Sequence, residues 1–475
     1  MRKPMKAYAI NSMNLRYRYG SKSERFVEAD KAQLNLFDFS PSLAEETKVA
    51  DTCSIAVAGH HRHKKGKAYK ALPSRIEIIP VSEADKQCSC GLVKAVIRYE
   101  SKQLIHHQPA IFEIIEQRRE VVACSHCDDK APVTAASPPQ VLPKVKATES
   151  FLAFLVVSKL HDRQPLYHLE KQLLERHHLD CSRQTMARWL IELTEPLQPI
   201  FNLLKDQIID YEVASCDATS LQVLREPDRA AETKSYVYCM RGGPPGKEAI
   251  LYAYNDKQHK VFIKDWFQEF KGYLQVDGDP FFEEIGKTAK LVNCHAHGRR
   301  KFEPIAKLSK NKGLAKEALA FYKALYRIER EAKINQLTPL QRYQLRQEHS
   351  KPLLMKFKAW LDQHYPTVLP QSPLGQAMTY CLKFWQGFER FLEDGRLEID
   401  NNGCEREIKP IVIARKNFLF AATVPGAHAL CMHFSLIRTA RVHGHDPYHY
   451  YVKLLKNLPH CQSLQDYEAL LPWNI

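Results

Sequence analysis

The stretch Val213-Ala-Ser-Cys-Asp-Ala-Thr-Ser-Leu-Gln-Val223 has the composition of a strand and carries one charged residue in its middle. A shorter strand pattern, Gly272-Tyr-Leu-Gln-Val-Asp-Gly278, follows later in the chain and ends on a second aspartate. Between them, residues 235–254 alternate in the way strands do, and residues 261–270 have a helical period. This order of three strands, a helix and a strand predicts an α/β fold with a mixed sheet.

Two aspartates and one glutamate on this frame are candidate metal ligands. Asp217 lies inside the first strand, where a buried charge is costly unless it is paired or liganded. Asp277 ends the later strand, at the edge where open sheets place ligands. Because the two aspartates are sixty positions apart (277 minus 217), they can lie on adjacent strands. Glu405 follows Asp400 and Asn401, either of which can cap a helix that carries Glu405 on its first turns.

Three carboxylates suit metal-assisted chemistry at phosphorus. In-line displacement there calls for two divalent ions about 3.5 to 4 Å apart, and hard oxygen ligands suit Mg²⁺ or Mn²⁺. A single Asp or Glu chosen by position is more often a helix cap or a member of an ion pair. On the residues alone, that alternative stays open.

The basic composition points to a polyanionic partner. Lys and Arg number 69 against 54 Asp and Glu, which gives a formal charge of +15. Such a field attracts DNA through its phosphates, although a basic surface kept for solubility is the alternative. A chain of 475 residues predicts two to four domains. Without a secretory signal or an apolar run near the roughly 20 residues of a membrane span, we expect a cytoplasmic protein.

The N-terminal region predicts an arm and a small metal module. Residues 1–75 are polar with basic clusters, which is typical of a partly disordered basic arm. Residues 76–133 contain strand-like stretches between two cysteine pairs, whose thiolates would hold one structural Zn²⁺ in a zinc-finger-like β module. The cysteines are Cys88, Cys90, Cys124 and Cys127. Because the first pair has a single intervening residue, two packed cysteine pairs remain the alternative.

Residues 148–205 have a helical period and the size of a helix-turn-helix region. Ser182 is a plausible N-cap for its second helix, from which Arg183 and Arg188 would face a DNA major groove. Plain packing of a helical hairpin is the alternative. Residues 304–395 are also strongly helical and predict an insertion into the sheet domain.

Further cations flank the candidate ligands and predict contacts with DNA phosphates. They are Arg299, Arg300, Lys301, Arg406, Lys409, Arg415 and Lys416. A solvated basic face is the alternative. Beside them, Cys294, His295 and His297 could form a second metal site, but a packed Cys294 with a hydrogen-bonding His297 is the preferred interpretation.

Several motifs make the chain resemble the insertion-sequence-66 family of bacterial transposases, over nearly the whole length. The most specific are Asp400-Asn-Asn-Gly-Cys-Glu-Arg406, Arg415-Lys-Asn-Phe-Leu-Phe420 and Cys294-His-Ala-His-Gly-Arg-Arg-Lys-Phe302. Ser435-Leu-Ile-Arg-Thr-Ala-Arg441 and Gly444-His-Asp-Pro-Tyr448 continue the match.

The resemblance implies a ribonuclease-H-like catalytic domain whose triad binds the metal ions. It would comprise residues 206–303 and 396–440, with the insertion between them and a C-terminal tail at 441–475. By this resemblance the metal-binding triad is Asp217, Asp277 and Glu405, and the N-terminal cysteines form a zinc-finger-like domain. The family's usual Asp-Glu-Thr is Asp-Ala-Thr here, so any supporting role of that glutamate is absent.

The function implied is that of a transposase, which binds the ends of an insertion sequence and catalyses metal-dependent DNA cleavage and strand transfer. The expected partners are the terminal inverted repeats, target DNA, further copies of the chain on DNA and accessory proteins of the element. We expect it to associate with the nucleoid. A transposase-derived DNA-binding protein without catalysis is the main alternative, and a nuclease that does not join ends is another.

Overall fold

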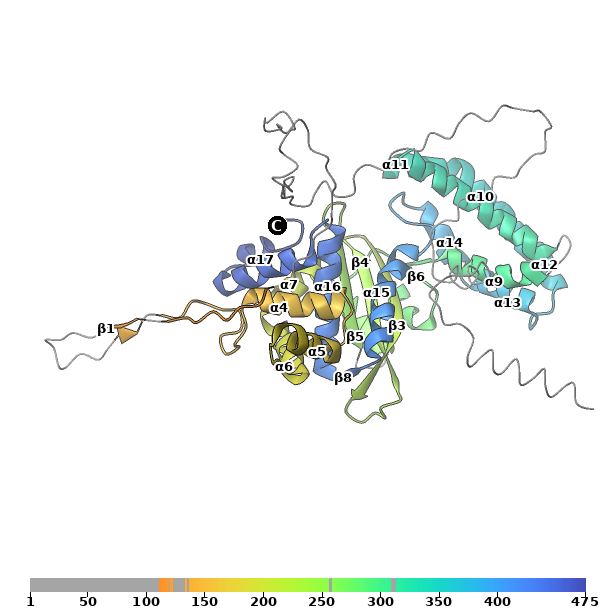
Figure 1. The fold of residues 1–475 in the computed structure, drawn as a ribbon. Helices are drawn as coiled ribbons and strands as arrows, with labels where there is room; N and C mark the ends of the chain where they lie inside the picture. Colours follow the sequence, from red (N-terminus) through yellow and green to blue (C-terminus); the bar gives the residue numbers. More distant parts are fainter. Residues whose placement is uncertain (1–110, 119, 123–132, 135, 256–258, 309–312) are drawn as a thin grey trace, which may run out of the picture. The chain divides into compact units, whose positions relative to one another are not determined.

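The computed structural model describes residues 111–118, 120–122, 133–134, 136–255, 259–308 and 313–475. Apart from residues 111–114, these belong to one compact unit, Ile115–Ile475 (Figure 1). The predicted arm at 1–75 lies outside the described residues. So do the four cysteines of the predicted zinc module, and zinc binding there stays a prediction.

A mixed sheet forms the centre of the fold and confirms the predicted α/β class. Its strands run in the order β5-β4-β3-β6-β7, and β8 pairs with the far end of β3. The pairs β3–β4 and β4–β5 are antiparallel, whereas β6 and β7 run parallel to β3. The strand bounds are β3 (Val213–Arg225), β4 (Lys234–Gly242), β5 (Ala249–Asn255), β6 (Tyr273–Val276), β7 (Lys290–Asn293) and β8 (Ala421–Thr423). Before this sheet, β1 (Val121–Val122) pairs with β2 (Val133–Thr134).

The parallel register of β3 and β6 determines where the two aspartates lie. Ser215 is the last residue of β3 paired with β6, and its partner is Gln275. Asp217 and Asp277 each follow two residues later, so both positions lie on the same side of their strands as the last pair. The sheet therefore gives the two residues corresponding positions, Asp217 within β3 and Asp277 just after the adjacent β6, an arrangement that the sequence allowed.

A helix covers the outer edge of the sheet at β5. The Ser435 hydroxyl accepts a hydrogen bond from the Tyr252 amide at 2.8 Å, and the Thr439 hydroxyl accepts one from the Ile250 amide at 3.0 Å. Both side chains belong to α16 (Val424–Val442). Because these hydroxyls satisfy backbone groups that face away from β4, the edge is closed against further strand pairing.

Helices before and after the sheet pack together beside it (Figure 1). Ser182 caps the helix that starts at Arg183, as predicted, by accepting a hydrogen bond from the Thr185 amide at 3.2 Å. The preceding helix ends at His177, and His178 follows it in a left-handed conformation. The helices before the sheet are α4 (Glu149–Val156), η2 (Val157–His161), α5 (Leu166–His177), α6 (Arg183–Glu192) and α7 (Thr194–Ile209). Those after it are α15 (Asn402–Phe418), α16, α17 (Pro447–Asn457) and α18 (Leu464–Glu468).

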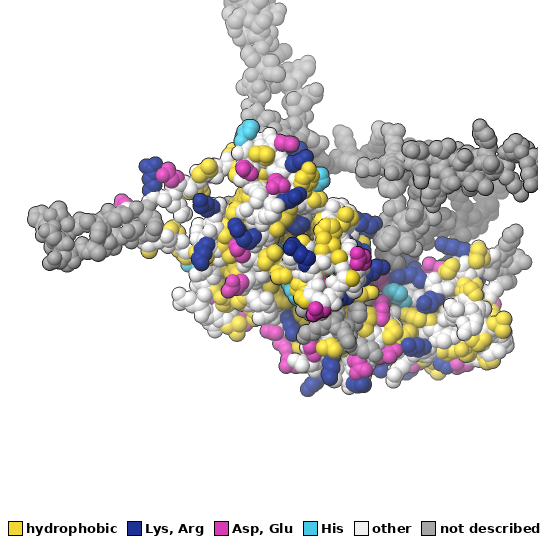
Figure 2. Space-filling view, turned by 90° about the horizontal axis from the view of Figure 1, so that it is seen from below, with side chains coloured by type: hydrophobic (Ala, Val, Ile, Leu, Met, Phe, Trp, Pro, Cys, Tyr) yellow, Lys and Arg dark blue, Asp and Glu magenta, His cyan; other side chains and the backbone are white. Residues whose placement is uncertain are grey.

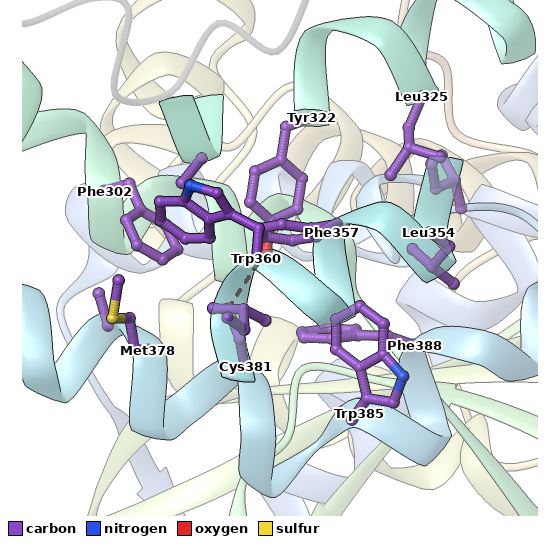
Figure 3. Close-up of a cluster of buried hydrophobic side chains, with 14 of the residues drawn as sticks. Phe302, Tyr322, Leu325, Leu354, Phe357, Trp360, Met378, Cys381, Trp385 and Phe388 are labelled. Atoms are coloured by element: carbon purple, nitrogen blue, oxygen red, sulfur yellow. Dashed lines mark hydrogen bonds between the residues drawn. The ribbon is translucent and has the colours of Figure 1, made fainter. Parts of the chain in front are cut away.

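The region after β7 is helical and has its own aromatic core. Tyr322, Phe357 and Phe388 are fully buried in it, and the Tyr322 hydroxyl lies 3.4 Å from the Cys381 sulfur (Figure 3). Its helices are α9 (His295–Leu308), α10 (Leu314–Ile334), α11 (Pro339–Leu345), η5 (Arg346–Ser350), α12 (Lys351–His364), α13 (Pro373–Lys383) and α14 (Trp385–Glu389). Between β5 and β6 lies α8 (His259–Trp266), and the 3-10 segments are Pro280–Phe282, Ile285–Lys287, Tyr365–Thr367, Arg390–Leu392 and Leu458–His460. No helix among the described residues combines the length and apolar character that a membrane span needs.

A buried arginine ties this helical region to the chain that leads back to the sheet. The Arg346 side chain is fully buried, and its Nε donates to Glu329 Oε1 at 2.7 Å. Its terminal nitrogens donate to Glu329 Oε2 and to three backbone carbonyls, those of Phe391, Asp394 and Leu397. All five N–H donors of the guanidinium are therefore used, as burial of this group requires.

We predict that Arg346→Ala lowers the free energy of unfolding by about 3 kcal/mol, because Glu329 and three carbonyls lose a buried partner. Thermal unfolding measures the change, and hydrogen exchange should speed up in α10 and in residues 391–397. Lys358→Ala is the control, because its ion pair with Asp362 is exposed and should be worth less than about 1 kcal/mol. Equal effects of the two substitutions would contradict the role given to Arg346.

Candidate active site

Asp217 is the first of the acidic residues that the fold brings together. It lies in β3 opposite Cys239 of β4, and its Oδ1 accepts a hydrogen bond from the Ala218 amide at 2.8 Å. Burial raises the pKa of its carboxyl to about 7, and repulsion from Asp277 and Glu405 adds to that rise. A carboxyl in this setting binds either a proton or a cation near neutral pH.

Asp277 directly follows β6, in a turn that hydrogen bonds from other residues stabilise. Its Oδ1 accepts from the Asp279 amide at 3.0 Å, and the Tyr380 hydroxyl donates to its backbone carbonyl at 2.7 Å. Gly278 has φ +92°, and a side chain there would also come within 3.0 Å of the Tyr380 hydroxyl. Burial is the main cause that raises the pKa of Asp277. The turn thus presents this carboxylate next to Asp217.

The segment 398–401 carries the chain to the third acidic residue and is pinned to the sheet. The Gln275 side chain of β6 donates to the Glu398 carbonyl at 2.7 Å. The Asn401 side chain is buried and donates to the Cys216 carbonyl at 2.9 Å, immediately before Asp217, and its amide donates to Cys294 Sγ at 3.1 Å.

The helix that carries Glu405 is capped by Asp400 rather than by the residue at its N-cap. Asn401 occupies the N-cap position of α15, but its side chain makes no capping hydrogen bond. Asp400 Oδ1 instead accepts from the Asn402 amide at 3.1 Å, while the Tyr326 hydroxyl of α10 donates to Oδ2 at 2.9 Å. Asp400 therefore caps α15, whereas the Asn401 side chain bonds β3.

Glu405 lies on the first turn of α15 and faces two residues of α9. Arg300 Nη2 donates to both of its carboxylate oxygens, at 2.9 and 2.8 Å, and His297 Nδ1 lies 3.6 Å from Oε1. Burial raises the pKa of Glu405 even though Arg300 opposes that shift. Repulsion from Asp400 and Asp277 also raises it, so the three predicted ligands share one electrostatic environment.

The carboxylate of Glu405 is nonetheless turned toward α9 rather than toward the aspartates. Among the described residues, one group of His, Cys, Asp or Glu ligand atoms lies within 4.8 Å of one another, and its members are Cys294, His297 and Glu405. Burial raises the pKa of the Cys294 thiol far above its usual range and lowers that of His297 to about 4. These three side chains could hold a metal ion, so the second metal site stays open beside the preferred interpretation of a packed Cys294 with a hydrogen-bonding His297.

The predicted DNA-binding cations differ in what they contact. Arg415 donates to Ser220 of β3 at 3.0 Å, so it supports the strand next to Asp217. Arg299 lies 3.2 Å from Glu303, and Lys301 lies over the Tyr380 ring at 4.6 Å. Arg406, Lys409 and Lys416 are exposed on α15.

On the helices before the sheet, Arg183 lies over the Tyr167 ring at 5.6 Å, and Arg188 lies 3.7 Å from Glu192 with a largely exposed side chain. Across the described face in Figure 2, Lys and Arg side chains are interspersed with Asp and Glu. DNA contact by any of these cations stays a prediction.

The sequence did not indicate the contacts that three residues make in the site, namely Tyr380, Asn401 and Arg300. Tyr380 comes from the helical insertion, and no motif links it to Asp277. Asn401 was expected only as a cap, although its place in the block that ends at Arg406 was a signal. Arg300 was expected to contact DNA. The signal for a local polar network was the nearby His297.

Comparison with known proteins places the chain among relatives of one kind. A family model described as "Transposase IS66 family" matches residues 144–429, and one described as "IS66 C-terminal element" matches residues 435–473. The chain is also similar to three proteins of Sinorhizobium fredii (strain NBRC 101917 / NGR234), each described as uncharacterized. It is 29% identical to y4qI over 97% of this chain and 87% of that protein, 28% identical to y4jD over 96% and 92%, and 28% identical to y4hP over 96% and 86%.

We predict that Asp217→Asn stabilises the metal-free protein clearly more at pH 8 than at pH 5. The raised pKa means that Asp217 contributes stability present below about pH 4 and lost as the pH rises through about 7. The amide cannot ionise, so the thermal midpoint of the variant should exceed that of the unaltered protein by about 3 °C at pH 8. A shift of equal size at pH 5 would show that ionisation is not the cause.

We also predict that Asn401→Ala lowers the thermal midpoint by several degrees, because the Cys216 carbonyl is left buried without its partner. Asn402→Ala is the matched control, since the side-chain hydrogen bond of Asn402 within the described part of the chain goes to the nearby Asp400, at 2.8 Å. A midpoint equally low in both variants would contradict a special role for Asn401.

Proposed function

The chain belongs to the IS66 family of transposases, and on that premise we propose that it cuts DNA at the ends of an insertion sequence and joins them to a target. The observation that carries the proposal is the mutual electrostatic repulsion of Asp217, Asp277 and Glu405, although the Glu405 carboxylate is turned toward Arg300. They come from β3, from the end of β6 and from the first turn of α15, and the pKa of each is raised by burial.

The residues present fit divalent ions. All three ligands are carboxylates, which Mg²⁺ and Mn²⁺ prefer, and the two aspartates repel one another in the absence of a bound cation. That repulsion is relieved by any ion that the two share. When bound, two such ions lower the pKa of an attacking water and stabilise the leaving oxygen.

The chain's own residues would orient the reaction. Asp217 and Asp277 would bind from adjacent strands, with the turn after β6 held by the Tyr380 hydroxyl. Glu405 would bind from α15, whose start is fixed to β3 through Asn401. Water attack on a phosphodiester breaks the bond to the 3′ oxygen and leaves a 3′ hydroxyl. In strand transfer that hydroxyl attacks a target phosphodiester, and the target's own 3′ oxygen leaves.

Substrate binding would use the cations around the triad. Arg406, Lys409 and Lys416 are exposed on the helix that carries Glu405, so their charges can reach DNA phosphates near the reacting one. The helix pair α5 and α6 is the candidate for reading the terminal repeats, through Arg183 and Arg188. A ribonuclease-H-like ancestry and an N-terminal zinc module belong to the same proposal.

We predict that Asp217→Asn, Asp277→Asn and Glu405→Gln each lower DNA cleavage by at least about a hundredfold, because each removes a metal ligand. The assay incubates the full chain with Mg²⁺ and labelled DNA carrying the inverted repeats that flank its reading frame. Binding to that DNA, measured by band shift, should change by less than about threefold.

Asp362→Asn is the control, because this exposed carboxylate on α12 pairs with Lys358 and with no other cation among the described residues. Cleavage that survives all three triad substitutions would overturn the proposal. A band shift without any cleavage by the unaltered protein would favour the DNA-binding alternative. Cleavage without covalent joining to a target would indicate a nuclease.

A further inference from the structure

We propose that Arg300 is an exchangeable counter-cation of the active site, which holds Glu405 until divalent ions load and then moves to a DNA phosphate. This inference rests on the proposed function and adds a positioning residue to it. It makes metal loading and DNA binding mutually dependent through a single side chain.

The geometry shows that Arg300 occupies the oxygens that a metal ion would need. One nitrogen, Nη2, lies 2.9 and 2.8 Å from the two carboxylate oxygens of Glu405. The side chain of Glu405 is only 13% exposed, so few other directions of approach to these oxygens remain. A divalent ion that takes Glu405 as a ligand therefore competes directly with the guanidinium.

The charge of Arg300 acts on all three carboxylates of the triad. Its positive charge lowers the pKa of Asp217, of Asp277 and, most strongly, of Glu405. One cation thus faces three carboxylates, which is the charge role that metal ions would take over. Guanidinium and dication repel each other at close range, so both should not occupy the site together.

His297 is a second contact of the Arg300 side chain. Arg300 Nη1 lies 3.4 Å from His297 Nε2, and His297 Nδ1 lies 3.6 Å from Glu405 Oε1. The imidazole therefore contacts Arg300 without placing a second carboxylate beside it. The Arg300 side chain is also 32% exposed, which leaves it a route to solvent.

A DNA phosphate is the natural second partner for the released guanidinium. Arginine binds phosphate and carboxylate with the same paired N–H geometry, and DNA supplies phosphates beside the bond being cut. If DNA draws Arg300 away from Glu405, the affinity for metal rises. By linkage, metal that displaces Arg300 then raises the affinity for DNA by the same factor.

The test measures Mn²⁺ binding to the full chain by electron paramagnetic resonance, without DNA and with a DNA duplex. The relevant sites are those that Asp217→Asn removes. Arg300→Gln should bind this Mn²⁺ about tenfold more tightly without DNA, because the competing charge-assisted hydrogen bonds are gone. DNA should tighten Mn²⁺ binding in the unaltered protein and do so much less in the variant.

Arg299→Gln is the matched control, because its guanidinium contacts Glu303 and the Tyr326 ring rather than Glu405. Its Mn²⁺ affinity in the absence of DNA should equal that of the unaltered protein. Arg300→Lys, which retains the charge but replaces the guanidinium by an ammonium group, should give an intermediate affinity and serves if the glutamine variant does not fold.

The outcomes separate the two proposals. Equal Mn²⁺ affinities in the unaltered protein, Arg300→Gln and Arg300→Lys, with binding still dependent on Asp217, would overturn the exchange and leave the proposed function standing. No Mn²⁺ site that depends on Asp217 would overturn the proposed function itself.

Discussion

The parallel pairing of β3 with β6 is the constraint on which the rest of the site depends. It joins residues sixty positions apart, so that the positions of Asp217 and Asp277 correspond across two adjacent strands. A shift of the register by one residue would turn one carboxylate to the opposite face of the sheet. Two contacts with other parts of the chain require the same position of β6. The Tyr380 hydroxyl bonds the Asp277 carbonyl, and the buried Gln275 side chain bonds the Glu398 carbonyl.

The third carboxylate depends on a different kind of contact. Asn401 is buried and bonds the Cys216 carbonyl, which fixes the start of α15 beside the strand that carries Asp217. Just upstream, the Leu397 carbonyl accepts from the buried Arg346, so the helical insertion and the position of Glu405 share one anchored segment. The insertion is therefore part of the site's support, and Tyr380 and Tyr326 extend it to Asp277 and Asp400.

The sequence predicted the sheet and the spacing of its aspartates well, because strand alternation and a charged residue within a strand are local signals. It did not predict β7 or β8. β8 has only three residues, and β7, although as long as β6, does not end on a charged residue that would mark it as Asp277 marks β6. Of the two residues that the sequence offered as caps, Asp400 caps α15, whereas the Asn401 side chain bonds a strand 185 residues away in sequence, which no local pattern indicates. Arg300 could not be assigned to Glu405 either, since their contact spans 105 residues and nothing local distinguishes Arg300 from Arg299.

On the proposed function, Asp217, Asp277 and Glu405 together bind divalent ions for chemistry at phosphorus. Anomalous X-ray scattering from crystals of the full chain grown with Mn²⁺ would locate those ions. Manganese peaks are expected at Asp217 and Asp277, with Glu405 turned from Arg300 to complete the ligands. Manganese found only elsewhere, with the Arg300–Glu405 contact intact and the aspartates without an ion, would contradict the proposed function.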